Sequence, residues 1–102
     1  MFEYMVTLVR VIDGDTIEVD LDLGFHVTLR QRCRLYGLNT PERGQDGYHE
    51  ATAALVALLA PKFSVKSIKP EDKYGRWIVE IPGVAETMIA SGHAVPYFGG
   101  AR

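Results

Sequence analysis

Apolar and polar residues alternate over the first third of the chain. Between residues 16 and 23 the apolar side chains fall at positions 17, 19, 21 and 23, and the residues between them are polar. This period-two alternation predicts a half-buried β-strand. The same reasoning predicts strands at 5–12 and at about 27–38, and the Asp13-Gly14 pair is typical of a turn that closes a hairpin.

The third predicted strand carries a row of arginines. Its alternation directs one set of side chains toward the core, Val27, Leu29, Cys33 and Leu35, and the other set toward the opposite face, Arg30, Arg32 and Arg34. Cys33 is the one cysteine of the chain, so it has no internal disulfide partner, and we expect it to be a small buried apolar residue.

The pattern changes in the second half of the chain. Residues 42–47 are rich in Gly, Gln and Asp and predict a loop, and residues 48–60 predict a helix that Pro61 ends. Strands are expected near 63–68 and 75–81, joined by a charged turn around 69–72, and a helix at 84–91 is expected to end at Gly92. This order predicts a mainly β, α+β fold: a five-stranded OB-type barrel with two helices. An SH3-like barrel is the alternative.

Size and charge limit the class of protein. The 102 residues predict a single domain. Because the chain lacks any run near the roughly 18 apolar residues of a membrane span and any leader after Met1, we expect a cytoplasmic protein without membrane contact. The net charge of −2 argues against tight binding to long nucleic acid, which uses clustered cations. The cations instead form two local clusters, at positions 30–34 and 73–76.

Three short segments carry the unusual chemistry: 13–16, 33–42 and 72–76. Each alone is more often structural, as a hairpin turn, a strand end or a polar turn. Together they supply carboxylates, an amide oxygen and two arginines at strand ends and loops, where a rigid barrel positions functional groups. His26, His49 and His93 lack metal-ligand spacing and are not candidates.

These segments resemble, in order, three signature blocks of the staphylococcal nuclease-like (thermonuclease) family. The blocks are Ile12-Asp13-Gly14-Asp15-Thr16, then Arg34-Leu35-Tyr36-Gly37-Leu38-Asn39-Thr40-Pro41-Glu42, then Asp72-Lys73-Tyr74-Gly75-Arg76. The resemblance extends from about Met5 to Tyr97. It implies an OB barrel that hydrolyses DNA or RNA phosphodiesters with calcium and leaves a 3′-phosphate and a 5′-hydroxyl.

The resemblance also implies a role for each matched residue. Asp15, Asn39 and the Thr40 carbonyl would bind the metal. Glu42 would orient or deprotonate the attacking water, and Arg34 and Arg76 would bind the scissile phosphate. Lys73 and Tyr74 would contact a terminal phosphate. An oxygen-only ligand set suits Ca²⁺, with Mg²⁺ or Mn²⁺ as alternatives.

The sequence departs from the family in two places. Asn39 stands where the family usually has a metal-ligating aspartate, which predicts weaker calcium binding. A catalytically weak module that binds nucleic acid or protein is therefore the alternative to a nuclease, and a structural domain is a third interpretation. The chain also ends where the family commonly continues into a third helix. We accordingly expect an uncovered apolar face and a homodimer formed through residues 95–98.

Overall fold

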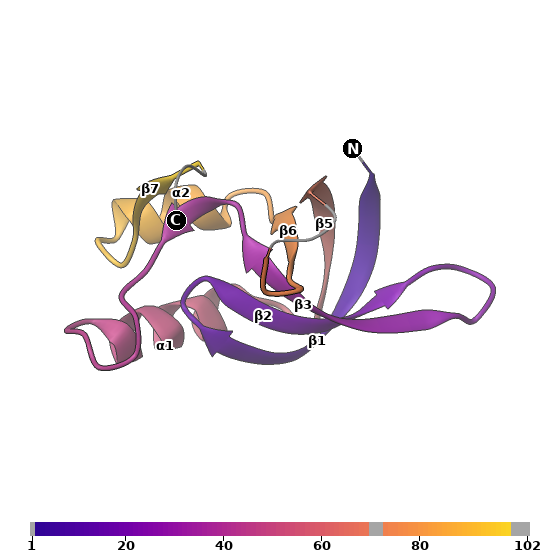
Figure 1. Cartoon of the computed structure of the whole chain (residues 1–102), viewed down its shortest axis with the longest axis horizontal. Helices are drawn as coiled ribbons and strands as arrows, with labels where there is room; N and C mark the ends of the chain where they lie inside the picture. Colours follow the sequence, from indigo (N-terminus) through magenta and orange to yellow (C-terminus); the bar gives the residue numbers. More distant parts are fainter. Residues whose placement is uncertain (1, 70–72, 99–102) are drawn as a thin grey trace.

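The computed structural model describes residues 2–69 and 73–98, and a closed barrel of five strands forms its centre (Figure 1). The strands are β1 (Glu3–Asp13), β2 (Thr16–Asp22), β3 (Thr28–Leu35), β5 (Lys62–Lys69) and β6 (Trp77–Glu80). Their order around the barrel is β1-β2-β3-β6-β5, and β5 pairs with β1 to close it. Only the β3–β6 pair is parallel among these five neighbouring pairs. This α+β arrangement confirms the OB-type prediction over the SH3-like alternative.

Two helices and a small second sheet lie at one end of the barrel (Figure 1). Helix α1 (Tyr48–Leu58) precedes β5 and contacts β1, and helix α2 (Val84–Ala90) follows β6. The short strands β4 (Gly37–Asn39) and β7 (Val95–Tyr97) pair antiparallel, and α2 contacts both of them. None of the helices in the described ranges is long and apolar enough to cross a membrane.

The core fills the barrel and extends beneath the helices. The completely buried apolar side chains come from most of the elements, and they include Ile17, Val19, Leu21, Leu38, Ala51, Leu55, Val65 and Met88. The alternation of β2 therefore predicted its buried face correctly as far as Leu21. Cys33 is buried as expected, and burial raises the pKa of its thiol to about 12.

The structure corrects the predicted third strand. It ends at Leu35, and the chain bends at Tyr36 and at Gly37, the first residue of β4, which lies in the left-handed region at φ 92°. Val27 and Leu29, predicted to be buried, are 51% and 39% exposed. The reason is that the β2–β3 hairpin projects past the barrel (Figure 1), so its outer half has no opposing layer to bury either face.

The predicted helices differ from the observed ones mainly at their ends. Helix α1 ends two residues before the predicted Ala60, and Leu59 is already extended at φ −92° and ψ 131°. Pro61 disfavours helical geometry at the residue before it, so the helix stops early. Helix α2 ends at Ala90, and Gly92 takes the predicted left-handed conformation at φ 83°. The expected turn at 69–72 lies outside the described residues except for Lys69.

Candidate active site

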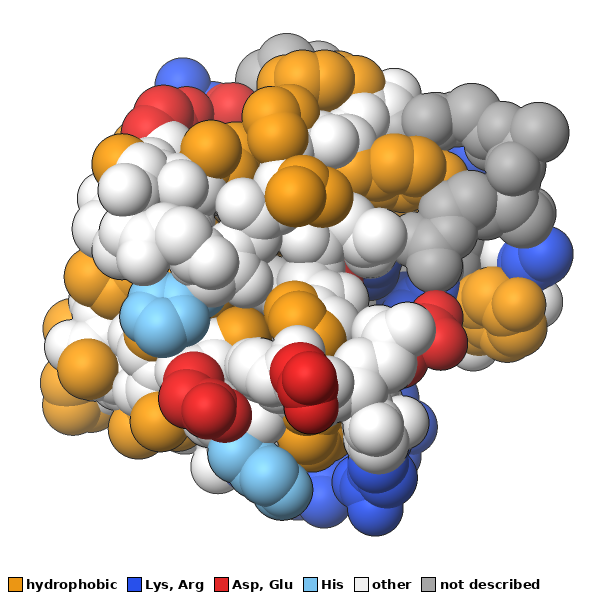
Figure 2. Space-filling model, turned by 90° about the vertical axis from the view of Figure 1, so that its left-hand side faces the viewer, with side chains coloured by type: hydrophobic (Ala, Val, Ile, Leu, Met, Phe, Trp, Pro, Cys, Tyr) orange, Lys and Arg blue, Asp and Glu red, His pale blue; other side chains and the backbone are white. Residues whose placement is uncertain are grey.

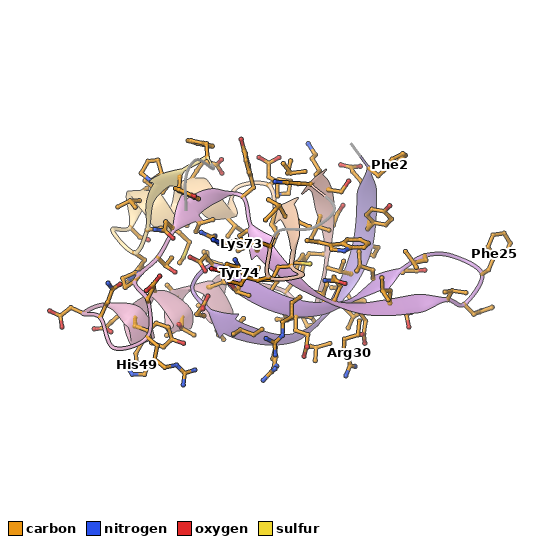
Figure 3. The ribbon with its side chains drawn as sticks, in the orientation of Figure 1. Phe2, Phe25, Arg30, His49, Lys73 and Tyr74 are labelled. Carbon is orange, nitrogen blue, oxygen red and sulfur yellow. The ribbon has the colours of Figure 1, made fainter. Side chains whose placement is uncertain are left out.

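A pocket of about 900 Å³ opens between the β1–β2 turn, the β3–β4 segment and the loop before β6. All eight residues that the sequence analysis singled out line it: Asp15, Arg34, Asn39, Thr40, Glu42, Lys73, Tyr74 and Arg76. Figure 3 shows Lys73 and Tyr74 on the loop before β6, far from the hairpin tip at Phe25, and His49 away on α1. The fold thus brings together three segments that are distant in the sequence.

Asp15 lies in the β1–β2 turn, where Asp13 pairs with Thr16 and leaves Gly14 and Asp15 as the two turn residues. Its carboxylate is buried and accepts two hydrogen bonds, from the Thr16 hydroxyl and from the Thr40 backbone N–H, both at 3.1 Å. Burial by itself raises the pKa of Asp15, but the Arg34 guanidinium at 3.5 Å, a hydrogen bond with the Asp13 side chain and the hydrogen bond from the Thr40 N–H outweigh burial and lower it. Asp15 is therefore an ionised carboxylate at neutral pH.

Asp13 is a pocket residue that the sequence analysis did not assign. Its Oδ1 accepts a hydrogen bond from the Asp15 backbone N–H at 3.2 Å. Desolvation, followed by the hydrogen bond and negative charge of the Asp15 side chain, raises the pKa of Asp13 to about 6. The Asp-Gly-Asp spacing was the available signal, because a two-residue hairpin turn brings the carboxylate before the turn close to the carboxylate within it.

The structure corrects the environment of Arg34. This residue was expected on a solvated strand face, yet it is only 8% exposed. One guanidinium nitrogen donates to the carbonyls of Leu35 at 2.9 Å and Leu38 at 3.0 Å, and the other donates to Asn39 Oδ1 at 3.1 Å. The Tyr97 ring, whose centre lies 5.9 Å from the guanidinium carbon, also packs near Arg34. Arg34 is thus a fixed cation in the pocket wall.

Thr40 is held close against the β1–β2 turn. A Cβ added to Gly14 would lie 2.8 Å from the Thr40 hydroxyl oxygen and 3.0 Å from the Ala51 Cβ. The turn, the segment after β4 and helix α1 meet at this point and leave no room for a side chain, so the position requires glycine. This close approach allows the Thr40 N–H to reach Asp15. The Thr40 hydroxyl is buried and has no hydrogen-bond partner among the described residues.

Glu42 lies exposed in the loop after β4. Its backbone N–H donates to Gln45 Oε1 at 2.7 Å, so a hydrogen bond within the loop stabilises the loop conformation. Gln45 was not singled out from the sequence, because a polar residue in a Gly- and Asp-rich loop carries no visible signal of this contact. Glu42 lines the pocket together with residues of the loop before β6.

The loop before β6 carries a cluster of two cations around one aromatic ring. Tyr74 is 70% exposed, and both the Lys73 ammonium, at 5.2 Å, and the Arg76 guanidinium, at 5.0 Å, lie near its ring centre. Asp72, the first residue of the predicted block, lies outside the described residues. Lys73, Tyr74 and Arg76 line the same pocket as Asp15 and Glu42.

The aromatic residues at the end of the chain also belong to the pocket. Tyr36, Tyr97 and Phe98 line it, and the Phe98 ring meets the Tyr36 ring edge-on at 5.6 Å. The sequence analysis interpreted residues 95–98 as an apolar contact tail and predicted no strand there. Their place in the site depends on the β4–β7 pairing.

The donor groups in the pocket decide which metal ion could fit there. Within residues 2–69 and 73–98, no three His, Cys, Asp or Glu side chains form a group that could hold a metal ion. The pocket lining instead offers a mixed set: the carboxylates of Asp13, Asp15 and Glu42, the Asn39 side-chain amide, and Thr40. Oxygen ligands of this kind fit Ca²⁺ better than Zn²⁺ or Cu²⁺. Figure 2 shows basic side chains in a recess at this end of the molecule, with acidic side chains beside them.

Two known proteins are similar to this chain. Both are named "Uncharacterized endonuclease", one from Escherichia coli O157:H7 and one from Escherichia coli. Each is 34% identical over 95 residues, which cover 88% of this chain and 59% of the relative. The chain therefore spans about three-fifths of the length of the curated relatives it matches. No family model matches it.

Proposed function

We propose that this chain is a metal-dependent nuclease domain that hydrolyses phosphodiester bonds of DNA or RNA. The observation that carries the proposal is the convergence of eight residues from three distant segments on one pocket, which both carboxylates and cations line. The endonuclease names of the two relatives support the same class of reaction. The closer assignment, to the staphylococcal nuclease-like family, rests on the three motif blocks.

The proposed cation site consists of Asp15, Asn39 and the Thr40 carbonyl, with Ca²⁺ as the expected ion and Mg²⁺ or Mn²⁺ as alternatives. A bound divalent cation supplies Lewis-acid polarisation of a phosphate oxygen. The lowered pKa of Asp15 keeps this ligand charged. The hydrogen bond from the Thr40 N–H holds Asp15 and the segment after β4 together, so these ligands form one unit before any ion arrives.

Glu42 is the proposed general base. An exposed carboxylate on a braced loop can accept a proton from a water molecule within hydrogen-bond reach, a step typically worth about 10²–10⁴-fold. The oxygen of that water adds to phosphorus, and the bond from phosphorus to the 5′ oxygen breaks. The products are a 3′-phosphate and a 5′-hydroxyl, whose proton comes from the surrounding water.

Arg34 and Arg76 are the proposed stabilisers of the charge that develops on the phosphate oxygens. Guanidinium groups donate in a planar fork that matches phosphate, whereas lysine acts as a point charge. The two backbone carbonyls that hold Arg34 fix its charge at the pocket wall, so little reorganisation is needed during the reaction. Lys73 and Tyr74 are proposed to bind a neighbouring phosphate.

A binding module without useful catalysis is the second candidate. It is favoured by Asn39, which lacks the charge of an aspartate, and by its contact with Arg34, which engages a proposed metal ligand within the protein. Such a module would bind oligonucleotides equally well with and without a divalent cation. It would have no need for a general base at Glu42.

Alanine variants of the three proposed catalytic groups test the assignment. We expect Arg34→Ala, Glu42→Ala and Arg76→Ala each to lower the rate of cleavage by at least about 10²-fold. Arg30→Ala is the matched control, because Arg30 is exposed on the same strand and paired with Asp20 outside the pocket. Thermal unfolding must accompany the assay, since buried Arg34 also supports the fold. Unchanged rates in all three variants would defeat the catalytic assignment.

A further inference from the structure

The loop before β6 leaves the barrel where the β3–β6 ladder ends. The parallel pairing between these strands runs from Leu35 opposite Val79 to Cys33 opposite Trp77. Beyond that point a side chain continues the connection: Gln31 Nε2 donates to the Gly75 carbonyl at 2.9 Å and to the Arg32 carbonyl at 3.0 Å. Gln31 therefore links β3 to the loop that carries Lys73, Tyr74 and Arg76.

The chemistry of Gln31 fixes the direction of this contact. Both partners are carbonyl oxygens, so the amide nitrogen must face them, because only the nitrogen end of the side chain can donate. Gln31 shares its strand face with buried Cys33, yet it is polar and half-buried. A glutamine at this position of a barrel strand is more readily explained by its bond to the loop than by packing.

The bond acts on the peptide group that leads into Arg76. The Gly75 carbonyl belongs to the same planar unit as the Arg76 N–H, so fixing the carbonyl fixes the plane from which the Arg76 backbone continues. Gly75 takes a left-handed conformation at φ 76°, which most other residues avoid. A loop that turns on a glycine gains most from an external anchor, because glycine has the largest conformational freedom to lose.

We propose that Gln31 is a positioning residue that orients the phosphate-binding loop at Lys73–Arg76. This inference rests on the proposed function of that loop. Gln31 lies outside the pocket lining. It acts by holding Gly75, which places the Arg76 guanidinium and the Tyr74 ring against the pocket.

The test uses Gln31→Met, which keeps an unbranched side chain of similar length and removes the donor. Because one hydrogen bond contributes modestly, we expect the KM for a short single-stranded oligodeoxynucleotide to rise about two- to tenfold. Calcium affinity should stay unchanged, because the proposed cation ligands lie on other segments. Thr28→Met is the matched control, an exposed polar position on the same strand without a role in the pocket.

A second readout is independent of cleavage. Backbone ¹⁵N relaxation should give Gly75 and Arg76 order parameters near about 0.85 in the parent and below about 0.6 in Gln31→Met. If the loop loses order while KM is unchanged, the positioning role is overturned. If the loop stays ordered in the variant, the tether itself is overturned.

The parent protein also tests the tether directly, in case Gln31→Met does not fold. A scalar coupling across the hydrogen bond from Gln31 Nε2 to the Gly75 carbonyl is expected, and its absence would overturn the inference. If the parent neither binds nor cleaves the oligonucleotide, the proposed function fails and the phosphate-positioning role fails with it. The order parameters would in that case still report on the tether.

Discussion

At the scale of single residues, the two carboxylates of the β1–β2 turn have opposite tendencies. Arg34 and the Thr40 N–H lower the pKa of Asp15, whereas burial and the neighbouring Asp15 charge raise that of Asp13 to about 6. Pairs of acids whose surroundings separate their pKa values are typical of functional sites. Asp13 thus holds its proton in the pH range where Asp15 has already lost its own.

Asp13→Asn should change the pH dependence of stability. Asp13 has a higher pKa in the folded state, about 6, than its ordinary value of 3.8. Its contribution to the free energy of unfolding therefore falls as the pH rises from about 4 to about 6. Asparagine keeps the acceptor oxygen and carries no charge, so the variant should be more stable than the parent at pH 7, by about 1 kcal/mol after screening of a half-exposed group.

Urea unfolding in the presence of chelator measures this difference. Parent and variant should have nearly equal free energies of unfolding at pH 4 and diverge toward pH 7. The lowered pKa of Asp15 stabilises the folded state, and this stabilisation is lost only as the pH falls below the ordinary pKa of 3.8. It therefore does not interfere between pH 4 and pH 7. Parallel pH profiles for the two proteins would refute the assignment of a raised pKa to Asp13.

Asn39→Asp should tighten calcium binding. The substitution keeps the oxygen and adds a negative charge to the proposed ligand set, and ligand charge tunes calcium affinity by roughly an order of magnitude or more. Calorimetric titration of parent and variant with CaCl₂ is the measurement, with Asp46→Asn, in the loop outside the pocket, as a charge control. Equal or weaker affinity in the variant would remove Asn39 from the cation site.

Sequence patterns identified the pocket residues but not their surroundings. Alternation tells which face of β3 Arg34 occupies, whereas its burial depends on Tyr97, which approaches from the far end of the chain. The same limit applies to Gln45 and Gln31, since each bonds a backbone group that only the folded loops bring near. Side-chain types therefore predicted which of these residues line the pocket, and tertiary contacts determined how they are held.

At the scale of elements, the site depends on a close contact among three of them: the β1–β2 turn, the segment after β4, and α1. Gly14 lies at the centre of this contact. Gly14→Ala would place a methyl group 2.8 Å from the Thr40 hydroxyl oxygen and 2.9 Å from its methyl carbon. Such overpacking typically costs about 1–3 kcal/mol, and it should also displace the Thr40 N–H from Asp15.

A double-mutant cycle measures this contact. Thr40→Ala removes both of these Thr40 atoms, so Gly14→Ala should cost less in the Thr40→Ala background than in the parent. Free energies of unfolding from denaturant titration supply the four corners of the cycle. Additive effects would mean that the turn and the Thr40 side chain do not press on one another.

The elements differed in how well the sequence predicted them. The barrel strands and both helices have strong periodicity, and their existence was predicted correctly. β7 was missed because it is three residues long, contains Pro96, and has its partner β4 far back in the chain. The burial of Val27 and Leu29, near the tip of the β2–β3 hairpin, was predicted wrongly. Alternation shows which side chains share a face of a strand, but it does not show whether another part of the protein covers that face.

At the scale of the whole molecule, self-association stays a prediction. Val95 is 59% exposed and Phe98 67% exposed, and apolar side chains gather at the top of Figure 2. Exposed apolar patches often mark contact surfaces, and two-fold dimers are the commonest homo-oligomers. We therefore expect light scattering to give a dimer mass as the concentration rises. A monomer mass at every concentration up to about 100 μM would contradict this.

We propose that the pocket hydrolyses phosphodiesters with a divalent cation. The most direct measurement incubates the purified protein with single-stranded DNA and with RNA, in the presence of Ca²⁺ or of chelator, beside an identically prepared Glu42→Gln variant. We expect cleavage that leaves 5′-hydroxyl ends, stops with chelator, and is at least about 10²-fold slower in the variant. Oligonucleotide binding without cleavage in Ca²⁺, Mg²⁺ and Mn²⁺, or cleavage that persists in chelator, would contradict it.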